Sequence, residues 1–244
     1  MLLVHSERQD YWTFGLQQAV GSRLRLDADY WQRHSKGSGD QDQFFNTGIV
    51  FPLAFQSGDY DGWDLRLDLA PTWGFRGFLS LGHVHVIYVP PPAGGLFLDS
   101  GAIDDITGGP FLIDHDQKLQ LQTGLFYDVG TTGIWLGTNV RYDSGLVSGA
   151  APEDLVGDPD NEFAIPYINT DHAGTGLDPY RIKPRTVVDF SLGADLTRYH
   201  VPVTVQLMVL NATDVKGLYN ILSTFGGTHV IPPRRFAGRV SFVF

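Results

Sequence analysis

Acidic and histidine side chains gather in one region of the sequence and are the first candidates for chemistry. They are His83, His85, Asp104, Asp105, Asp114, His115 and Asp116. An Asp–His or Asp–Asp pair within hydrogen-bond reach can activate water as a general base, so the cluster is compatible with a hydrolase. An acidic, solvated loop beside two strand histidines explains the same residues more simply, and we favour that interpretation.

Metal binding is a second chemistry that these residues could support. The i, i+2 spacing of His83 and His85 puts both imidazoles on one face of a strand, but the set lacks a further fixed ligand. The acidic stretch Gly157–Glu162 offers oxygens for calcium without the spacing of an EF-hand loop. Phosphate-loop, dinucleotide and nucleophile-elbow motifs are missing from the sequence. We therefore predict no catalytic residue, no metal site and no cofactor.

Composition excludes several classes of protein. The 244 residues include no Cys, which rules out disulfide scaffolds and Cys-ligated metal sites. Asp and Glu number 27 against 17 Lys and Arg, and this net charge of -10 argues against a nucleic-acid partner. No apolar run is long enough for a transmembrane helix, and the first residues do not form a secretory signal peptide.

Strict alternation of apolar and polar residues is the main pattern, and it predicts β-strands with two different faces. Every second residue is apolar or uncharged in Leu24–Tyr30, Trp63–Leu69, Leu119–Tyr127, Ile134–Tyr142, Val188–Leu196, Val203–Val209 and Phe236–Phe244. Weaker patterns predict two more strands, over residues about 10–20 and 75–88. Short turns near Gly21, Pro71–Gly74, Gly130–Thr132 and Arg198–Val201 alternate with long loops near 36–61, 89–116, 147–184 and 214–234.

This order predicts an all-β fold: an antiparallel up-and-down meander of about nine or ten strands. Residues 45–55 are the candidate for a tenth strand, folded back on the others. Single-chain bacterial barrels have even strand numbers, so nine strands suggest a partial barrel. We expect residues 1–244 to form one barrel segment of a larger barrel.

One face of the sheet carries no charge and the other carries many, which is explained if the first meets hydrocarbon and the second meets water. No apolar-face position carries a charge, as expected for strands that meet hydrocarbon on one side. The interleaved charges are predicted to face the lumen: Arg25, Asp27, Asp64, Arg66, Asp68, Arg141, Asp189 and Arg239. They could pair across strands, which we favour, or select a charged solute. Aromatic residues should mark both interfaces, with Tyr30, Trp63, Tyr142 and Phe236 at the long-loop rim and Tyr127 and Phe244 at the other.

A soluble antiparallel protein is the alternative, because its strands also alternate. In that case the apolar face would point into a core, and Lys would be common on the exposed face. Most of the 17 basic residues are Arg instead. A further alternative is a complete small outer-membrane barrel that acts as a hydrolase.

The C-terminal third resembles the end of a TonB-dependent outer-membrane receptor. The matching residues are VLNATD at Val209–Asp214 and the segment Leu218–Phe244, where a Pro-Arg stretch leads into the last strand. Asn46–Leu69 is similar in pattern, and Ala212 replaces the usual Leu. The resemblance implies a 22-stranded barrel with a plugged lumen, of which this chain would be the C-terminal part, without the plug domain.

The same resemblance implies location in the outer membrane of a Gram-negative-type bacterium and uptake of a nutrient too large for porins. Membrane lipid would be one partner, and TonB would act only through the missing N-terminal part. The transported ligand is unknown. The last strand would be the signal for the barrel-assembly machinery, through Phe236, Val240, Phe242 and the terminal Phe244.

Overall fold

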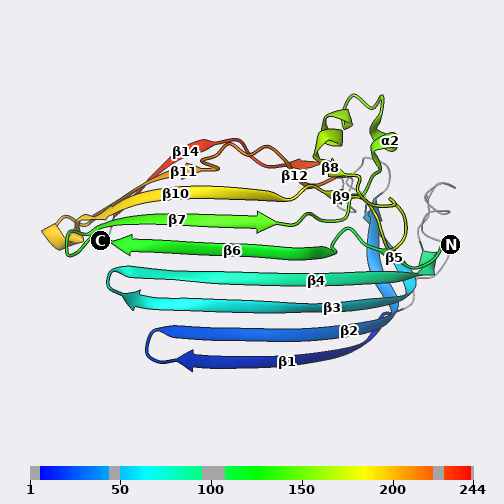
Figure 1. Ribbon diagram of the computed structural model, residues 1–244, viewed down its shortest axis with the longest axis horizontal. Helices are drawn as coiled ribbons and strands as arrows, with labels where there is room; N and C mark the ends of the chain where they lie inside the picture. The colour runs from blue at the N-terminus through cyan, green and yellow to red at the C-terminus, as the bar shows by residue number, and fades with distance from the viewer. Residues whose placement is uncertain (1–5, 44–49, 95–107, 222–227, 243–244) are drawn as a thin grey trace.

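One open antiparallel sheet dominates the computed structural model, which describes residues 6–43, 50–94, 108–221 and 228–242 (Figure 1). Nine strands follow one another across it in chain order. They are β1 (Arg8–Val20), β2 (Leu24–Gln43), β3 (Val50–Thr72), β4 (Phe75–Gly94), β6 (Gln117–Asp128), β7 (Ile134–Asp143), β10 (Arg185–Asp195), β11 (Val203–Leu210) and β14 (Arg235–Phe242). The short β5 (Phe111–Leu112) adds to β4. No helix among the described residues is long and apolar enough to cross a membrane.

The register keeps the apolar residues of neighbouring strands on one face. Leu26 lies opposite Leu67, and Leu67 lies opposite Leu79 on the next strand. The same match continues through the second half of the sheet, where Leu192 lies opposite both Leu136 and Leu207. Because side chains alternate along a strand, the interleaved charges then share the other face. We call these two surfaces the apolar face and the polar face.

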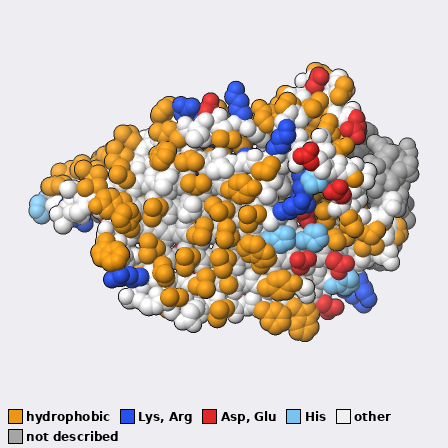
Figure 2. All heavy atoms as spheres, viewed as in Figure 1, with side chains coloured by type: hydrophobic (Ala, Val, Ile, Leu, Met, Phe, Trp, Pro, Cys, Tyr) orange, Lys and Arg blue, Asp and Glu red, His pale blue; other side chains and the backbone are white. Residues whose placement is uncertain are grey.

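The apolar face is exposed, and this separates the membrane prediction from the soluble one. Leu136, Phe190, Leu207 and Phe242 are between 49% and 61% exposed. Figure 2 shows the hydrophobic side chains as a broad band over the strands, with His, Asp and Glu gathered beyond one end of it. In the described part of the chain no second sheet covers this face. A soluble sandwich would bury these side chains, so their exposure favours the membrane prediction.

The strands are longer at the N-terminal side than the sequence predicted. β3 has 23 residues and β2 has 20, whereas about 9–11 residues are enough to cross a bilayer. The predicted loop at 36–61 is therefore wrong, since most of it continues β2 and β3. Residues 50–55 belong to β3, so the described part of the candidate tenth strand is not separate. The nine-strand count is confirmed.

All four short turns lie at one end of the sheet, together with the end of β14 (Figure 1). Aromatic residues mark this end. Phe75 and Tyr127 pair across β4 and β6 with ring centroids 4.7 Å apart, and Trp73 is 81% exposed beside Arg23. Phe244 lies outside the described residues. The aromatic residues at this end therefore include Trp73 and Phe75 in addition to the predicted Tyr127.

A charge on the apolar face should be far more costly than the same charge on the polar face. Leu192→Lys replaces an apolar-face residue, and we expect it to lower the free energy of unfolding in lipid by about 2–4 kcal/mol. Ser191→Lys, one residue away on the polar face, is the control and should cost much less. Urea unfolding in liposomes measures both. Equal losses would contradict the assignment of the faces.

Candidate functional site

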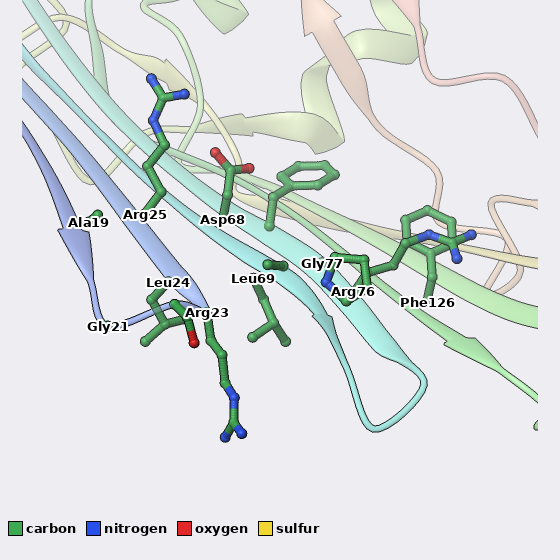
Figure 3. A pocket seen from close by; sticks show the side chains of 14 residues that line it. Ala19, Gly21, Arg23, Leu24, Arg25, Asp68, Leu69, Arg76, Gly77 and Phe126 are labelled. Carbon is green, nitrogen blue, oxygen red and sulfur yellow. The ribbon is translucent and has the colours of Figure 1, made fainter.

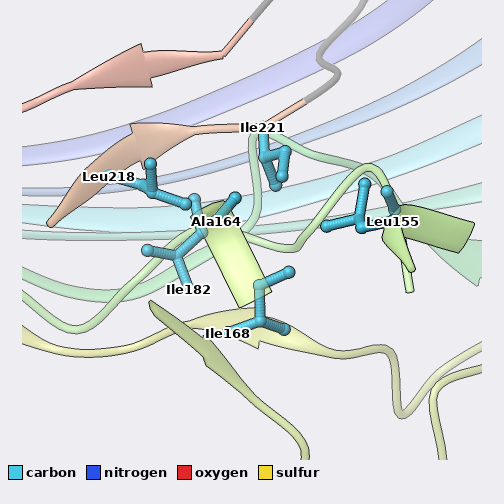
Figure 4. Packing of buried hydrophobic residues seen from close by; sticks show 7 residues of the cluster. Leu155, Ala164, Ile168, Ile182, Leu218 and Ile221 are labelled. Atoms are coloured by element: carbon cyan, nitrogen blue, oxygen red, sulfur yellow. The ribbon is translucent and has the colours of Figure 1, made fainter. Parts of the chain in front are cut away.

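The long-loop end of the sheet holds a small hydrophobic core of its own (Figure 4). It is built from helix α2 (Pro152–Leu155), the 3-10 helix η1 (Glu162–Tyr167), the hairpin of β8 (Ile168–Asn169) and β9 (Arg181–Ile182), and β12 (Leu218–Asn220), which pairs with β13 (His229–Val230). The buried side chains of this loop core are Ala150, Leu155, Ala164, Ile168, Ile182, Leu218 and Ile221. Residues from two long loops thus pack into one hydrophobic cluster beside the sheet.

A buried ionic network joins this unit to the strands. Asp116 is 1% exposed, forms an ion pair with the Nη2 of Arg181, and accepts a hydrogen bond from the backbone N of Val86 at 3.2 Å. Its Oδ2 also lies 2.7 Å from Nδ1 of His85. Arg181 belongs to β9 in the 147–184 segment, whereas His85 and Val86 belong to β4. The carboxylate of Asp116 therefore fixes the position of a loop relative to the sheet.

The histidines proposed for chemistry do not converge. Nδ1 of His83 donates to the backbone oxygen of Lys118 at 2.9 Å, and His85 contacts Asp116. His115 pairs with Asp114 instead, at 3.1 Å. Asp104 and Asp105 lie outside the described residues. Within the described ranges no three His, Asp or Glu side chains are placed to hold a metal ion.

Aromatic residues form a second cluster on the extended parts of β2, β3 and β4. The hydroxyl of Tyr60 donates to that of Tyr88 at 3.1 Å and lies 2.5 Å from Oγ of Ser38. Burial raises the pKa of Tyr88 well above its ordinary value. The guanidinium of Arg33 stacks on Tyr60 at 3.6 Å. The alternation does not predict this cluster, because the positions that continue the apolar row before Trp63 are Asp61, Asp59 and Ser57, whereas Tyr60 lies on the other face.

The charges on the polar face largely neutralise one another. Arg25 lies opposite Asp68 and Asp27 opposite Arg66, and within each strand the ion pairs Arg25–Asp27 and Arg66–Asp68 measure 3.0 and 2.7 Å. Other polar-face charges have separate partners. Arg141 lies 3.7 Å from Asp189, Asp64 accepts from Nε1 of Trp31 at 3.4 Å, and Arg239 lies opposite Gln206. The two shorter ion pairs run along single strands and Arg141–Asp189 joins two neighbouring strands, so cross-strand pairing as the general arrangement stays a prediction.

A hollow of about 510 Å³ lies at the short-turn end, between β1, β2, β3 and β4. In Figure 3 the side chains of Arg25 and Asp68 project to one side of the sheet, and those of Leu69 and Arg23 project to the other. Arg76, which also lines it, is bound to Asp128 at 2.5 Å. Since its basic residues have partners, this hollow offers less free binding capacity than its three arginines suggest.

Asp116→Asn should loosen the loop core from the sheet. The change leaves Arg181 as an uncompensated buried cation, which typically costs about 3–5 kcal/mol. We expect faster proteolysis within residues 147–184, measured by limited digestion and mass spectrometry. Asp171→Asn removes an exposed charge from the same segment and should leave the rate unchanged. Adding Arg181→Met to Asp116→Asn should restore part of the protection, because it removes the orphaned cation.

The pKa of His115 should lie above its ordinary value because Asp114 accepts a hydrogen bond from the ring. The protonated form stabilises the fold below about pH 6.5, and this contribution is lost as the pH rises through the raised pKa. The side chain is 53% exposed, so solvent keeps the effect on stability small. A histidine NMR titration should show the raised midpoint, and Asp114→Asn should lower it.

Comparison with known proteins gives matches to solved structures only. No protein-family model and no curated protein matches the sequence. The ferric-catecholate import receptor Fiu of Escherichia coli K12 matches 96% of this chain with a TM-score of 0.59 and 15% identity. The ferripyoverdine receptor of the Pseudomonas aeruginosa outer membrane matches 98% with 0.60 and 12%, and the iron transporter FrpB of Neisseria meningitidis matches 97% with 0.61 and 13%.

The matches cover 27%, 27% and 31% of those three chains, so this chain spans less than a third of each. At such low identity the likeness concerns the fold. It agrees with the resemblance found in the residues of the last strands, which was an independent observation. The chain therefore has the β-barrel fold of TonB-dependent outer-membrane receptors, of which it corresponds to a fragment.

Proposed function

We propose that this chain is part of the barrel wall of a transport receptor in a bacterial outer membrane. The observation that carries the proposal is the exposed apolar face, which continues across nine antiparallel strands in one register. Hydrocarbon is the solvent that such a face suits, and each inner strand of the sheet is paired with a neighbour on both sides. The solved structures with the same fold are named as import receptors and transporters, which favours transport over catalysis.

The complete transporter would need more than the described sheet. β1 and β14 are its two edges, and an edge strand in lipid needs a partner for its N–H and C=O groups. We propose that further strands of a larger barrel pair with both. Coupling to TonB and the plug of the lumen would come from other parts of that protein. The cargo would be a nutrient too large for porins.

The long-loop end would face the outside of the cell and take part in ligand capture. Polar and aromatic side chains on the extended strands and the loop core lie together at this end, whereas the short-turn end offers mainly paired charges. A hydrolase is the weaker candidate. Its candidate Asp116 is 1% exposed and is used in an ion pair with Arg181. His85 contacts Asp116, but His83 and His115 have other partners.

Uptake is the direct test of this proposal. Deleting the gene that encodes this chain should lower the uptake of at least one of three radioactive iron complexes: iron bound to a catecholate, to pyoverdine or to citrate. Complementation should restore the uptake, and a proton uncoupler should abolish it, because the coupling is energy-dependent. The protein should sediment with the outer membrane. A protein found in the soluble fraction would contradict the proposal.

The last strand is proposed to recruit the barrel-assembly machinery. Phe236, Val240 and Phe242 lie on the apolar face of β14 and are exposed, while the terminal Phe244 lies outside the described residues. Deleting Phe244 from the native gene product should lower the amount of heat-modifiable barrel in the outer membrane severalfold. Ser241→Ala, on the polar face of the same strand, serves as the control. Normal assembly without Phe244 would contradict this role.

A further inference from the structure

A cavity of about 240 Å³ lies on the polar face near the long-loop end of the sheet. Side chains of β6, β7 and β10 form its wall, and Tyr219 of β12 reaches it from the 214–234 segment. The polar groups that line it are Gln120, Gln122, Arg141, Asp143, Arg185 and Tyr219. Apolar residues, including Leu146 and Val187, complete the wall. The cavity thus combines hydrogen-bonding groups with a hydrocarbon surface in a volume suited to a small molecule.

Arg185 is the unusual member of this set, because its cation is buried with unused donors. Its side chain is only 4% exposed, yet its Nε and Nη1 atoms are buried without a hydrogen-bond partner in the described structure. Its one carboxylate contact, Nη2 to Oδ2 of Asp143, is long at 3.4 Å. Asp143 also accepts a hydrogen bond from Nε2 of Gln117 at 3.1 Å. Buried donors of a charged group are costly when unsatisfied, so this guanidinium can still accommodate an acceptor.

The other charges around the cavity favour an anion. Arg141 contributes a second guanidinium, whose nearest carboxylate, Asp189, is 3.7 Å away. Two arginines and the carboxylate of Asp143 line the cavity, and Asp189 pairs with Arg141 from beside it. Tyr219 lies against Arg185, with the guanidinium 5.1 Å from its ring centroid, and holds the group in place from the loop side. Arg185 is therefore the cation whose donors remain for an anion.

We propose that this cavity binds the carboxylate group of a small organic solute, with Arg185 as the principal binding residue. A carboxylate can accept hydrogen bonds from the unused donors of Arg185, and guanidinium groups bind carboxylates with strong, directional hydrogen bonds. Val187 and the ring of Tyr219 would then contact the carbon skeleton of the ligand. Inorganic phosphate would leave this apolar surface unused. The inference deepens the proposed function and rests on it for its biological meaning, as part of ligand capture.

Calorimetry with the native gene product that carries this chain, purified in detergent, tests the proposal. The probe is benzoate, the neutral control is benzamide, and inorganic phosphate is the third ligand. We expect saturable binding of benzoate, with benzamide and phosphate each at least about tenfold weaker. Equal binding of benzamide would overturn the proposal, as would tighter binding of phosphate or no binding of benzoate.

Substitutions of opposite expected sign separate binding from misfolding. Arg185→Gln should weaken benzoate about tenfold or more, and Arg185→Lys should recover only part of the loss, because Lys lacks the planar fork. Asp143→Asn should strengthen binding severalfold, since it removes the competing negative charge. Arg23→Gln, at the opposite end of the sheet, should change nothing. An unchanged affinity in Arg185→Gln, or a weaker one in Asp143→Asn, would overturn the proposal.

The binding and uptake experiments fail in different ways. If iron uptake depends on the gene but benzoate does not bind, the carboxylate site is wrong and the transport function stands. If benzoate binds through Arg185 but the protein is absent from the outer membrane, the proposed function is wrong.

Discussion

Strand register is the constraint on which the rest of this structure depends. A shift of one residue between any two strands would move a whole row of side chains to the other face. The pairing of Leu26 with Leu67, of Leu67 with Leu79 and of Leu192 with Leu207 keeps one face free of charge across the sheet. In hydrocarbon, that continuity is required, because each misplaced charge costs about 2–4 kcal/mol near the middle of the bilayer.

The register also explains where the buried core lies. A sheet whose apolar face meets lipid has no need of a second layer, so the hydrophobic clusters form where the chain leaves that environment. One of them is the loop core around Leu155, Ile182 and Leu218, and the other surrounds Phe55 and Tyr88 on the extended strands. The ionic contact of Asp116 with Arg181 then holds the loop core against β4. The exposed apolar face of the sheet and the packed loop core at its end are thus built from separate interactions.

The polar face uses its charges in two different ways. Near the short turns, Arg25, Asp27, Arg66 and Asp68 alternate in sign along and across the strands, and this arrangement neutralises them locally. Near the long loops, Arg185 is buried beside a cavity with donors that the described residues leave unused. Arginines near the short turns therefore stabilise the sheet, whereas Arg185 near the long loops is available to bind a ligand. The difference arises from burial and partner geometry.

The alternation of residues by itself determined the nine strands, their antiparallel order, the two faces and the end at which the turns are short. These features are local, since a period of two and a turn motif can be recognised without knowing any partner. The sequence underestimated β2 and β3, because β2 beyond Trp31 and β3 between Ser57 and Gly62 contain mostly Gly, Ser and other polar residues in place of apolar ones. Backbone pairing with neighbouring strands maintains them there.

Only the tertiary structure decided which of the charged and histidine residues meet. Asp116 and Arg181 are 65 residues apart in sequence, and no periodic pattern links them. His83 and His85 lie on one face of the strand but contact different partners. The cavity at Arg185 is lined by residues of three strands of the main sheet and by Tyr219 of β12. Contacts of this kind depend on how long loops fold back over a sheet, and loop conformation is governed by packing that leaves little trace in local sequence.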